Sequence, residues 1–394
     1  GPSDAIIFSP AVTTVNNPTG DSPNGPAQFS ITMKAFDSKG DPLTPSPSNP
    51  IHVDVYGALS GVISPPSTTI PSGSSVTFTY SGAFFPNNIS INAWMTDPGT
   101  GGAAIGVTQV LMQNTSSCVY GTTSYQVPLT QTLPDALQVM ADVGYSLSSA
   151  PAALTTYTID TGSLGALVPS SKLPHDSNVI GPAGPGVKVY NSSGNTYSGN
   201  YYLARVSVQI QGGTVVQTIP IVVLGIDKAY CTGPSTKPCY QNPPSPTLHY
   251  LGVGFNRNST APGDLFNSPT ANAFLHLTNN VKNGTDVSPG YILTPNDSAT
   301  VTGLTLGVPA ASGYAVVNLT PNPSVPGDFK PQAGCYSFPG LPKPNQFCGT
   351  ALLDVGIDEM FLDLPFAQRP AGSFDSNNEV PAKVNMTIQM GAQN

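Results

Sequence analysis

Hydrophobic and polar residues alternate along this chain in short runs that are typical of half-buried β-strands. The clearest alternating runs are residues 29–35, 76–80 and 89–93, and residues 51–56 and 103–112 supply further strands. Clusters of Gly, Pro, Asp and Ser separate them, as in residues 37–41 and 71–73, and these residue types favour turns. The pattern predicts about six strands in the first 115 residues, without a long helix.

Strands of this length and spacing favour an immunoglobulin-like β-sandwich over residues 1–115. The strand pattern continues through residues 116–394 with longer loops. Only residues 271–278 and the stretch after Asp354 have helical character, and both are short. The sequence therefore predicts an all-β protein with two domains, joined near the polar segment 114–117.

The composition excludes several classes of function. The 394 residues include 13 Lys and Arg against 21 Asp and Glu, which gives a net charge of -8. Nucleic-acid binding needs clustered positive charge, so we expect no nucleic-acid partner. The longest apolar run, residues 219–226, is far shorter than the roughly 20 residues of a membrane-spanning helix. We therefore expect no membrane span.

Four of the five cysteines form two local pairs, Cys231 with Cys239 and Cys335 with Cys348, and Cys118 is left over. Each pair closes a Pro-containing loop, and neither spacing matches the Cys-x-x-Cys knuckles of zinc sites. We predict a disulfide in each pair and hence an oxidising location: secreted, periplasmic or cell surface. The four histidines are dispersed, so neither a metal site nor a cofactor is expected.

The most informative segment for chemistry is Tyr157-Thr-Ile-Asp-Thr-Gly-Ser163, in which an apolar strand leads directly into an Asp-Thr-Gly turn. An apolar Leu-Val-Pro follows at residues 167–169. A bare Asp-Thr-Gly is also explained by an Asx-turn at the end of a strand. Much later, the chain contains a second Asp-x-Gly in Ala351-Leu-Leu-Asp-Val-Gly356.

Together these segments resemble the active-site loops of pepsin-like aspartic peptidases over about residues 120–370. Between them, residues 187–199 resemble the flap hairpin, with Tyr190 as the flap tyrosine and Tyr197 as a rival for that role. Residues 250–255 resemble the apolar-apolar-Gly strand that threads the first active-site loop. Residues 271–275 resemble the short helix that follows it.

The resemblance implies an aspartic endopeptidase whose catalytic dyad is Asp160 and Asp354. Two carboxyls at close range share one proton, because both cannot ionise together. Thr161 would brace the two loops. Substrate contacts are implied for Tyr190, Gly162, Ser163 and Gly356. The expected partner is a peptide or protein in the cleft between two lobes of a monomeric protein.

Two features depart from the family pattern. Val355 stands where a Thr or Ser normally cross-braces the loops, so the Thr161 hydroxyl would lose a partner, at a cost of about 1–3 kcal/mol if left unsatisfied. Few residues follow Asp354 to supply a second threading strand. Within the pepsin-like domain, residues 116–394, we expect lobe one at about 120–285 and an incomplete or rearranged lobe two at about 286–394.

These departures leave open an alternative function, a catalytically inactive pepsin-like binding or adhesion module at the cell surface. They also draw attention to four acids within residues 354–363, namely Asp354, Asp358, Glu359 and Asp363. Acids of this kind favour the first turn of a helix that would begin near Ile357. The functional alternatives are a cation site or a role for Asp358 in the dyad.

Overall fold

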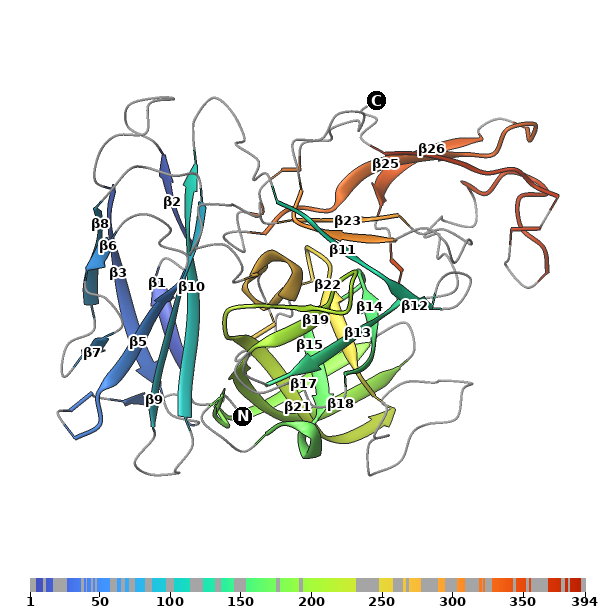
Figure 1. Cartoon of the computed structure of the whole chain (residues 1–394). Coiled ribbons are helices and arrows are strands. Elements are labelled where there is room, and N and C mark those ends of the chain that lie inside the picture. Colours follow the sequence, from blue (N-terminus) through green and yellow to red (C-terminus); the bar gives the residue numbers. More distant parts are fainter. Residues whose placement is uncertain are drawn as a thin grey trace.

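The chain forms several β-sheets in the computed structural model (Figure 1), which confirms the predicted all-β class. Among the described residues, the helical elements are three 3-10 helices of three residues each. The structure describes residues 5–9, 12–16, 27–36, 39, 41–43, 45–46, 48–56, 62–64, 68–70, 75–81, 87–96, 103–113, 123–131, 136–144, 154–174, 178–190, 194–231, 248–257, 265–266, 269–277, 290–294, 303–308, 319–320, 322, 328–342, 345–351, 354–355, 368–376, 380–381 and 383–390.

The first ten strands form one sheet, ordered β6-β8-β3-β1-β10-β9-β5-β7, with β2 paired to β10 and β4 to β3. These strands are β1 (Ala5–Ser9), β2 (Val12–Asn16), β3 (Ala27–Phe36), β4 (Pro42–Leu43), β5 (Ile51–Tyr56), β6 (Val62–Ser64), β7 (Thr68–Ile70), β8 (Ser75–Ser81), β9 (Asn87–Thr96) and β10 (Ala103–Gln113). All five segments that the sequence predicts to be strands in this part of the chain form strands, namely β3, β5, β8, β9 and β10.

One apolar core joins the two halves of this sheet. Met33 of β3 and Phe8 of β1 belong to the same buried cluster as Val53 of β5 and Ile91 of β9. The sheet therefore curls so that its halves face each other across the core. The assignment to an immunoglobulin-like sandwich stays a prediction.

An eleven-stranded sheet forms the centre of the molecule, ordered β16-β18-β21-β15-β22-β14-β13-β19-β20, with β12 paired to β13 and β17 to β18. Its strands are β12 (Leu129–Gln131), β13 (Gln138–Val143), β14 (Thr155–Asp160), β15 (Leu164–Pro169), β16 (Val179–Ile180), β17 (Pro185–Tyr190), β18 (Asn195–Ala204), β19 (Val206–Gln209), β20 (Val215–Gln217), β21 (Ile221–Cys231) and β22 (Tyr250–Val253). The 3-10 helix η1 (Ser170–Lys172) follows β15 directly.

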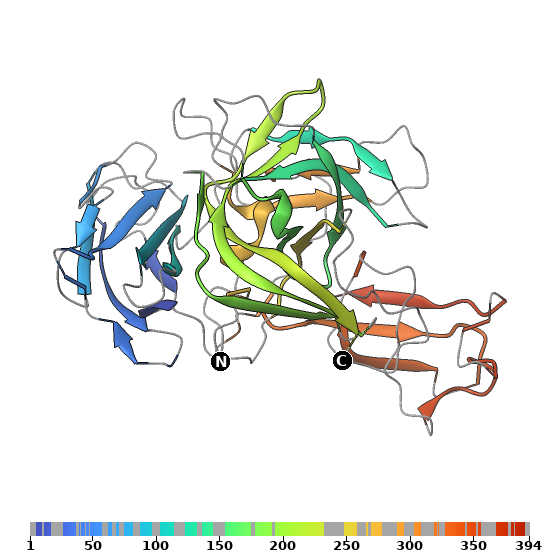
Figure 2. The same ribbon diagram turned by 90° about the horizontal axis from the view of Figure 1, so that it is seen from below.

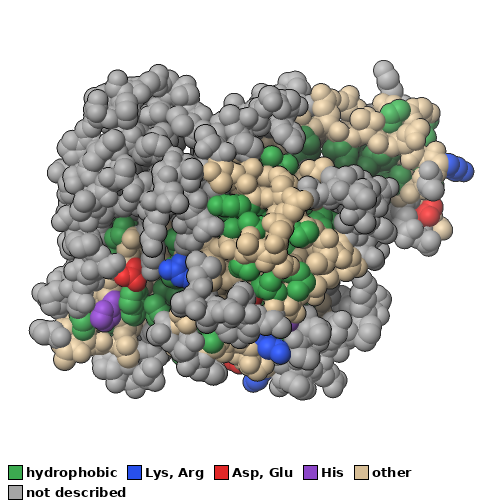
Figure 3. All heavy atoms as spheres, in the orientation of Figure 1, with side chains coloured by type: hydrophobic (Ala, Val, Ile, Leu, Met, Phe, Trp, Pro, Cys, Tyr) green, Lys and Arg blue, Asp and Glu red, His purple; other side chains and the backbone are tan. Residues whose placement is uncertain are grey.

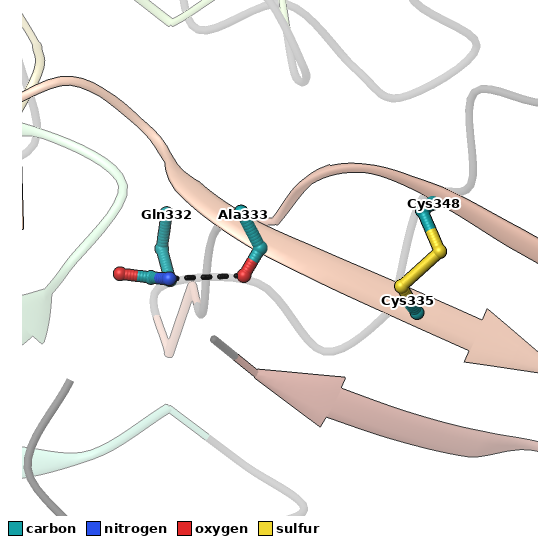
Figure 4. The surroundings of a disulfide bond; sticks show 4 residues. All are labelled: Gln332, Ala333, Cys335 and Cys348. Atoms are coloured by element: carbon teal, nitrogen blue, oxygen red, sulfur yellow. Dashed lines mark hydrogen bonds between the residues drawn. A yellow bond between two sulfur atoms is a disulfide. The ribbon is translucent and has the colours of Figure 1, made fainter. Parts of the chain in front are cut away.

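Two three-stranded sheets complete the fold. The first is β11 (Tyr125–Val127), β24 (Leu304–Leu306) and β23 (Tyr291–Leu293), and the second is β26 (Gln346–Ala351), β25 (Gln332–Ser337) and β27 (Thr387–Met390). The predicted Cys335–Cys348 disulfide links directly paired residues of β25 and β26 (Figure 4). The predicted Cys231–Cys239 pair and Cys118 lie outside the described side chains.

The N-terminal sheet packs against the central sheet. Both ribbon views place the strands β1–β10 beside the central strands and the sheet of β25 and β26 on the far side (Figures 1 and 2). Ile105 of β10 is buried in one cluster with Leu164 and Leu167 of β15. Asn92 of β9 donates through Nδ2 to the Pro220 carbonyl at 2.8 Å. The interface thus reaches the strand that leaves the Asp160 turn.

The segment expected to be helical at residues 271–278 forms two short 3-10 helices, η2 (Pro269–Ala271) and η3 (Ala273–Leu275). Asn272 separates them because its extended backbone interrupts the helix and its side chain accepts from the Phe274 N–H at 3.0 Å. Residues 356–367, where a helix was expected, lie outside the described residues. No helix in the described part of the chain is long and apolar enough to cross a membrane.

Charged side chains are sparse among the described residues on the face drawn in Figure 3. Hydrophobic side chains show there over the central sheet and along the sheet of β25 and β26, surrounded by backbone and by other uncharged side chains. This surface matches the low charged content of 9% for the whole chain.

Candidate functional site

The Asp160 turn is built by three neighbouring strands of the central sheet. β14 ends at Asp160 and β15 begins at Leu164, yet these two strands do not pair with each other. β22 lies between them, parallel to β14 and antiparallel to β15. The segment expected to thread the active-site loop therefore does so, with Gly252 opposite both Asp160 and Gly165.

The threading strand is held tightly on both sides of the turn. The Gly254 N–H donates to the Ser163 carbonyl at 2.8 Å, and a Cβ at Gly254 would overlap the Thr161 carbonyl oxygen. Behind it, the Val253 carbonyl accepts from Asn272 Nδ2 at 2.8 Å and from the Tyr291 hydroxyl at 2.6 Å. A turn packed this closely keeps its carboxylate in one position.

Hydrogen bonds from its own turn orient the Asp160 carboxyl. Oδ1 accepts from the Gly162 N–H at 2.7 Å, and Oδ2 accepts from the Ser163 hydroxyl at 2.5 Å. The residue is only 4% exposed. Both oxygens therefore have hydrogen-bond partners, and the buried side chain has little rotational freedom.

Asp354 lies against the same turn, although it is distant in sequence. A Cβ added at Gly162 would overlap the Asp354 carboxylate, so the absence of a side chain at Gly162 lets this carboxylate approach. The two carboxyls interact by charge and by a hydrogen bond. The predicted pair, Asp160 and Asp354, is thus brought together.

Burial is the main reason that the pKa of Asp160 rises from 3.8 to about 6. The Ser163 hydrogen bond opposes this rise, and the negative charge of Asp354 adds to it. Asp160 therefore keeps its proton up to weakly acidic pH. A protonated carboxyl beside a second carboxylate is the state that acid–base catalysis by two carboxyls needs.

A hydrogen bond joins the Asp160 turn to the segment at Asp354, but its donor is a main-chain group and not the side chain that the sequence suggested. The Val355 N–H donates to Thr161 Oγ1 at 2.9 Å. The donor is a main-chain group, so the missing hydroxyl of Val355 does not deprive Thr161 of a partner. The Val355 side chain instead packs against the core of the central sheet. The expectation that Thr161 would lose its partner, with the associated cost in stability, is therefore wrong.

The residues expected to form a flap hairpin pair as β17 and β18, and Tyr190 at the end of β17 reaches the Asp160 turn. The Tyr190 hydroxyl lies 3.4 Å from Ser163 Oγ, which also binds Asp160. Burial, followed by the negative charge of Asp160, raises the pKa of Tyr190 well above its usual value. This phenol therefore stays protonated and can serve as a hydrogen-bond donor near the dyad.

Tyr197, the rival for the role of flap tyrosine, supports Tyr190 from behind. Its ring is 2% exposed and meets the Tyr190 ring edge-on, with centroids 5.6 Å apart. Tyr250 of the threading strand completes the group, 5.8 Å from the Tyr190 ring centroid. Of the two candidates, Tyr190 is the one whose hydroxyl reaches the turn.

The sequence did not point to two charged residues near Asp160 and Asp354, which are Arg257 and Asp328. Asp328 is 1% exposed, and its oxygens accept from the Asn256 N–H at 2.9 and 3.0 Å. The Arg257 guanidinium interacts by charge with Asp354, Asp160 and Asp328. The only local sequence signal was the position of Arg257 just after the threading strand.

The remaining predicted residues have no place in this description. Gly356, Asp358, Glu359 and Asp363 lie outside the described residues. Within the described part of the chain, no group of three or more His, Cys, Asp or Glu side chains is arranged to hold a metal ion.

A scan against protein-family models finds no match, and a search of curated proteins finds no similar sequence.

Proposed function

We propose that the protein is a pepsin-like aspartic endopeptidase that cleaves peptide bonds with the Asp160–Asp354 pair. The observation that carries this proposal is the placement of Asp354 against Gly162, where its carboxylate couples to that of Asp160. Two coupled carboxyls on turns joined by the Val355–Thr161 hydrogen bond have the arrangement that water activation requires.

The reaction follows from the singly protonated state of the pair. The ionised carboxylate removes a proton from a water molecule, whose oxygen attacks the peptide carbonyl carbon. The protonated carboxyl gives its proton to the carbonyl oxygen, which forms a neutral gem-diol. When the C–N bond breaks, the diol loses a proton and the leaving nitrogen gains one, so the pair returns to its starting state.

The surroundings of the pair support binding of an extended peptide. The Tyr190 hydroxyl can donate near the turn, and β17, whose described strand partner is β18 alone, has a second edge for strand-like pairing with a substrate. We further propose that the protein acts outside the cytoplasm, since the Cys335–Cys348 disulfide favours an oxidising compartment.

The proposal is tested by incubating the purified chain with a reduced, alkylated protein from pH 3 to pH 8. We expect cleavage at acidic pH, and we expect Asp160→Asn and Asp354→Asn each to abolish it. The exposed Lys172→Met variant is the control for a change of charge. If the folded wild type cuts no protein at any pH, or if Asp354→Asn cuts as fast as the wild type, the peptidase assignment is wrong.

Val355 is the observation that favours the alternative, a binding module without catalysis, because its side chain contributes no hydroxyl to the brace. A folded protein that retains peptides in its cleft without cutting them would support that function.

A further inference from the structure

Arg257 follows a segment whose main chain is held by two sets of hydrogen bonds. Three residues earlier, Gly254 is hydrogen-bonded to the Asp160 turn through the Ser163 carbonyl. The preceding residue, Asn256, has φ of 53° and donates its N–H to both oxygens of Asp328. The main chain at Arg257 thus passes between the catalytic turn and a buried carboxylate.

The guanidinium group of Arg257 is half-buried, and its Nε is fully buried without a hydrogen-bond partner among the described residues. Burial lowers the pKa of Arg257, and the charges of Asp354, Asp160 and Asp328, in that order, oppose the effect. An arginine keeps its charge under these conditions, because the guanidinium group is not deprotonated in proteins. A positive charge therefore stands beside the dyad.

The other described groups that face the dyad do not supply such a charge. Gly162 and Ser163 are neutral donors from the turn, and Tyr190 is a neutral phenol from the flap. Behind Tyr190 lie the phenols of Tyr197 and Tyr250, and beyond Arg257 lies the acidic Asp328. Burial disfavours the negative charge that the dyad must carry, and Arg257 favours it.

We propose that Arg257 is the counter-charge that keeps the Asp160–Asp354 pair singly ionised down to acidic pH. In this role Arg257 is a positioning residue that acts through the charge of the pair. Asp328 is the anchor that positions it, through Asn256. The catalytic meaning of this inference rests on the proposed peptidase function, whereas the electrostatic coupling itself does not.

The test compares Arg257→Met, Arg257→Gln and Arg257→Lys with the wild type in two measurements. The first is the pH dependence of kcat/KM for a peptide substrate. The second is the titration of the dyad carboxyls by NMR of protein carrying 13C-labelled aspartate, with signals assigned from Asp160→Asn and Asp354→Asn. Lys172→Met removes an equal charge from an exposed position.

We expect both neutral variants to shift the titration and both limbs of the kcat/KM profile to higher pH. The shift should be about one pH unit, the lower end of what a neighbouring opposite charge produces. Arg257→Lys keeps the positive charge and should show only a small part of this shift, and Lys172→Met should leave the profile unchanged. If Arg257→Met fails to fold, the difference between Arg257→Gln and Arg257→Lys still tests whether the positive charge shifts the titration.

The outcomes separate this inference from the peptidase proposal. A titration that shifts in a chain that cuts no substrate retains the counter-charge role and rejects the peptidase. Cleavage with an unshifted profile and titration in the neutral variants rejects the counter-charge role alone. A rise in KM confined to acidic substrates, without a shift, would assign Arg257 to substrate binding and also overturn the proposal.

Discussion

Replacement of Asp160 by Asn should change how the stability of the protein depends on pH. The folded-state pKa of Asp160 is about 6, against 3.8 for an unperturbed aspartate, and burial is the main cause. Below pH 3.8 the carboxyl is mostly protonated in both the folded and the unfolded chain, so it adds no pH dependence to the free energy of unfolding. Between the two values the unfolded chain releases its proton first, so the free energy of unfolding falls as pH rises.

The magnitude follows from the same two values. The difference between these pKa values corresponds to a fall of about 3 kcal/mol in the free energy of unfolding of the wild type between about pH 4 and pH 6. The Asn variant should lack this fall. Relative to the wild type, Asp160→Asn should therefore gain about 3 kcal/mol between pH 4 and pH 7. Asp142, whose pKa burial raises to about 7, adds a slope in the same direction, but it is present in both proteins and cancels.

The assay is urea denaturation followed by circular dichroism at pH 4, 5, 6 and 7, with the disulfides intact. Mass spectrometry of each sample verifies that the chain is uncut. Asp41→Asn, at an exposed position, controls for the loss of one negative charge. Parallel stability curves for wild type and Asp160→Asn would refute the reasoning, because they would mean that folding does not perturb the Asp160 carboxyl.

Three further substitutions probe the site and its surroundings. Thr161→Val should cost about 1–3 kcal/mol, because the half-buried Val355 N–H loses its acceptor, and urea denaturation at pH 5 measures this loss. Equal denaturation midpoints for the variant and the wild type would mean that water replaces the hydroxyl. Gly162→Ala should displace the Asp354 carboxylate and reduce kcat by about 100-fold or more, since small misplacements are costly in catalysis; unchanged turnover would contradict the close approach of that carboxylate. Cys348→Ser should destabilise the sheet of β25 and β26 by about 2–4 kcal/mol, which amide hydrogen exchange in that sheet reports, and unaltered exchange would show that the disulfide is dispensable there.

Local patterns predicted the strands well because alternation along a strand reflects its own two faces. The run at residues 29–35 became β3 (Ala27–Phe36), and residues 51–56 became β5 with the same bounds. The Asp160 turn and its threading strand were also predictable, since each lies in a contiguous segment. The role of Tyr190 as a flap tyrosine stays a prediction. The 3-10 geometry of η2 and η3 was not, because it depends on Asn272 binding Val253 across the sheet.

Contacts between distant segments limited the prediction of the site. The sequence shows that Val355 lacks a hydroxyl, but it does not show that its main-chain N–H reaches Thr161. The role of Arg257 likewise depends on Asp328, whose carboxylate binds Asn256 across a separation of 72 residues. No period or motif links these residues, so only their packing in three dimensions identifies them.

The central claim, that Asp160 and Asp354 act as one dyad, is tested most directly by calorimetric titration with a pepstatin-type inhibitor at pH 5. The statine hydroxyl of such an inhibitor occupies the position of the attacking water between two carboxyls, so binding requires both and does not depend on the choice of substrate. We predict binding of one inhibitor by the wild type, weakened at least about 100-fold by Asp160→Asn and by Asp354→Asn alike. A folded wild type that binds no inhibitor, or an Asp354→Asn variant that binds as tightly as the wild type, would contradict the claim.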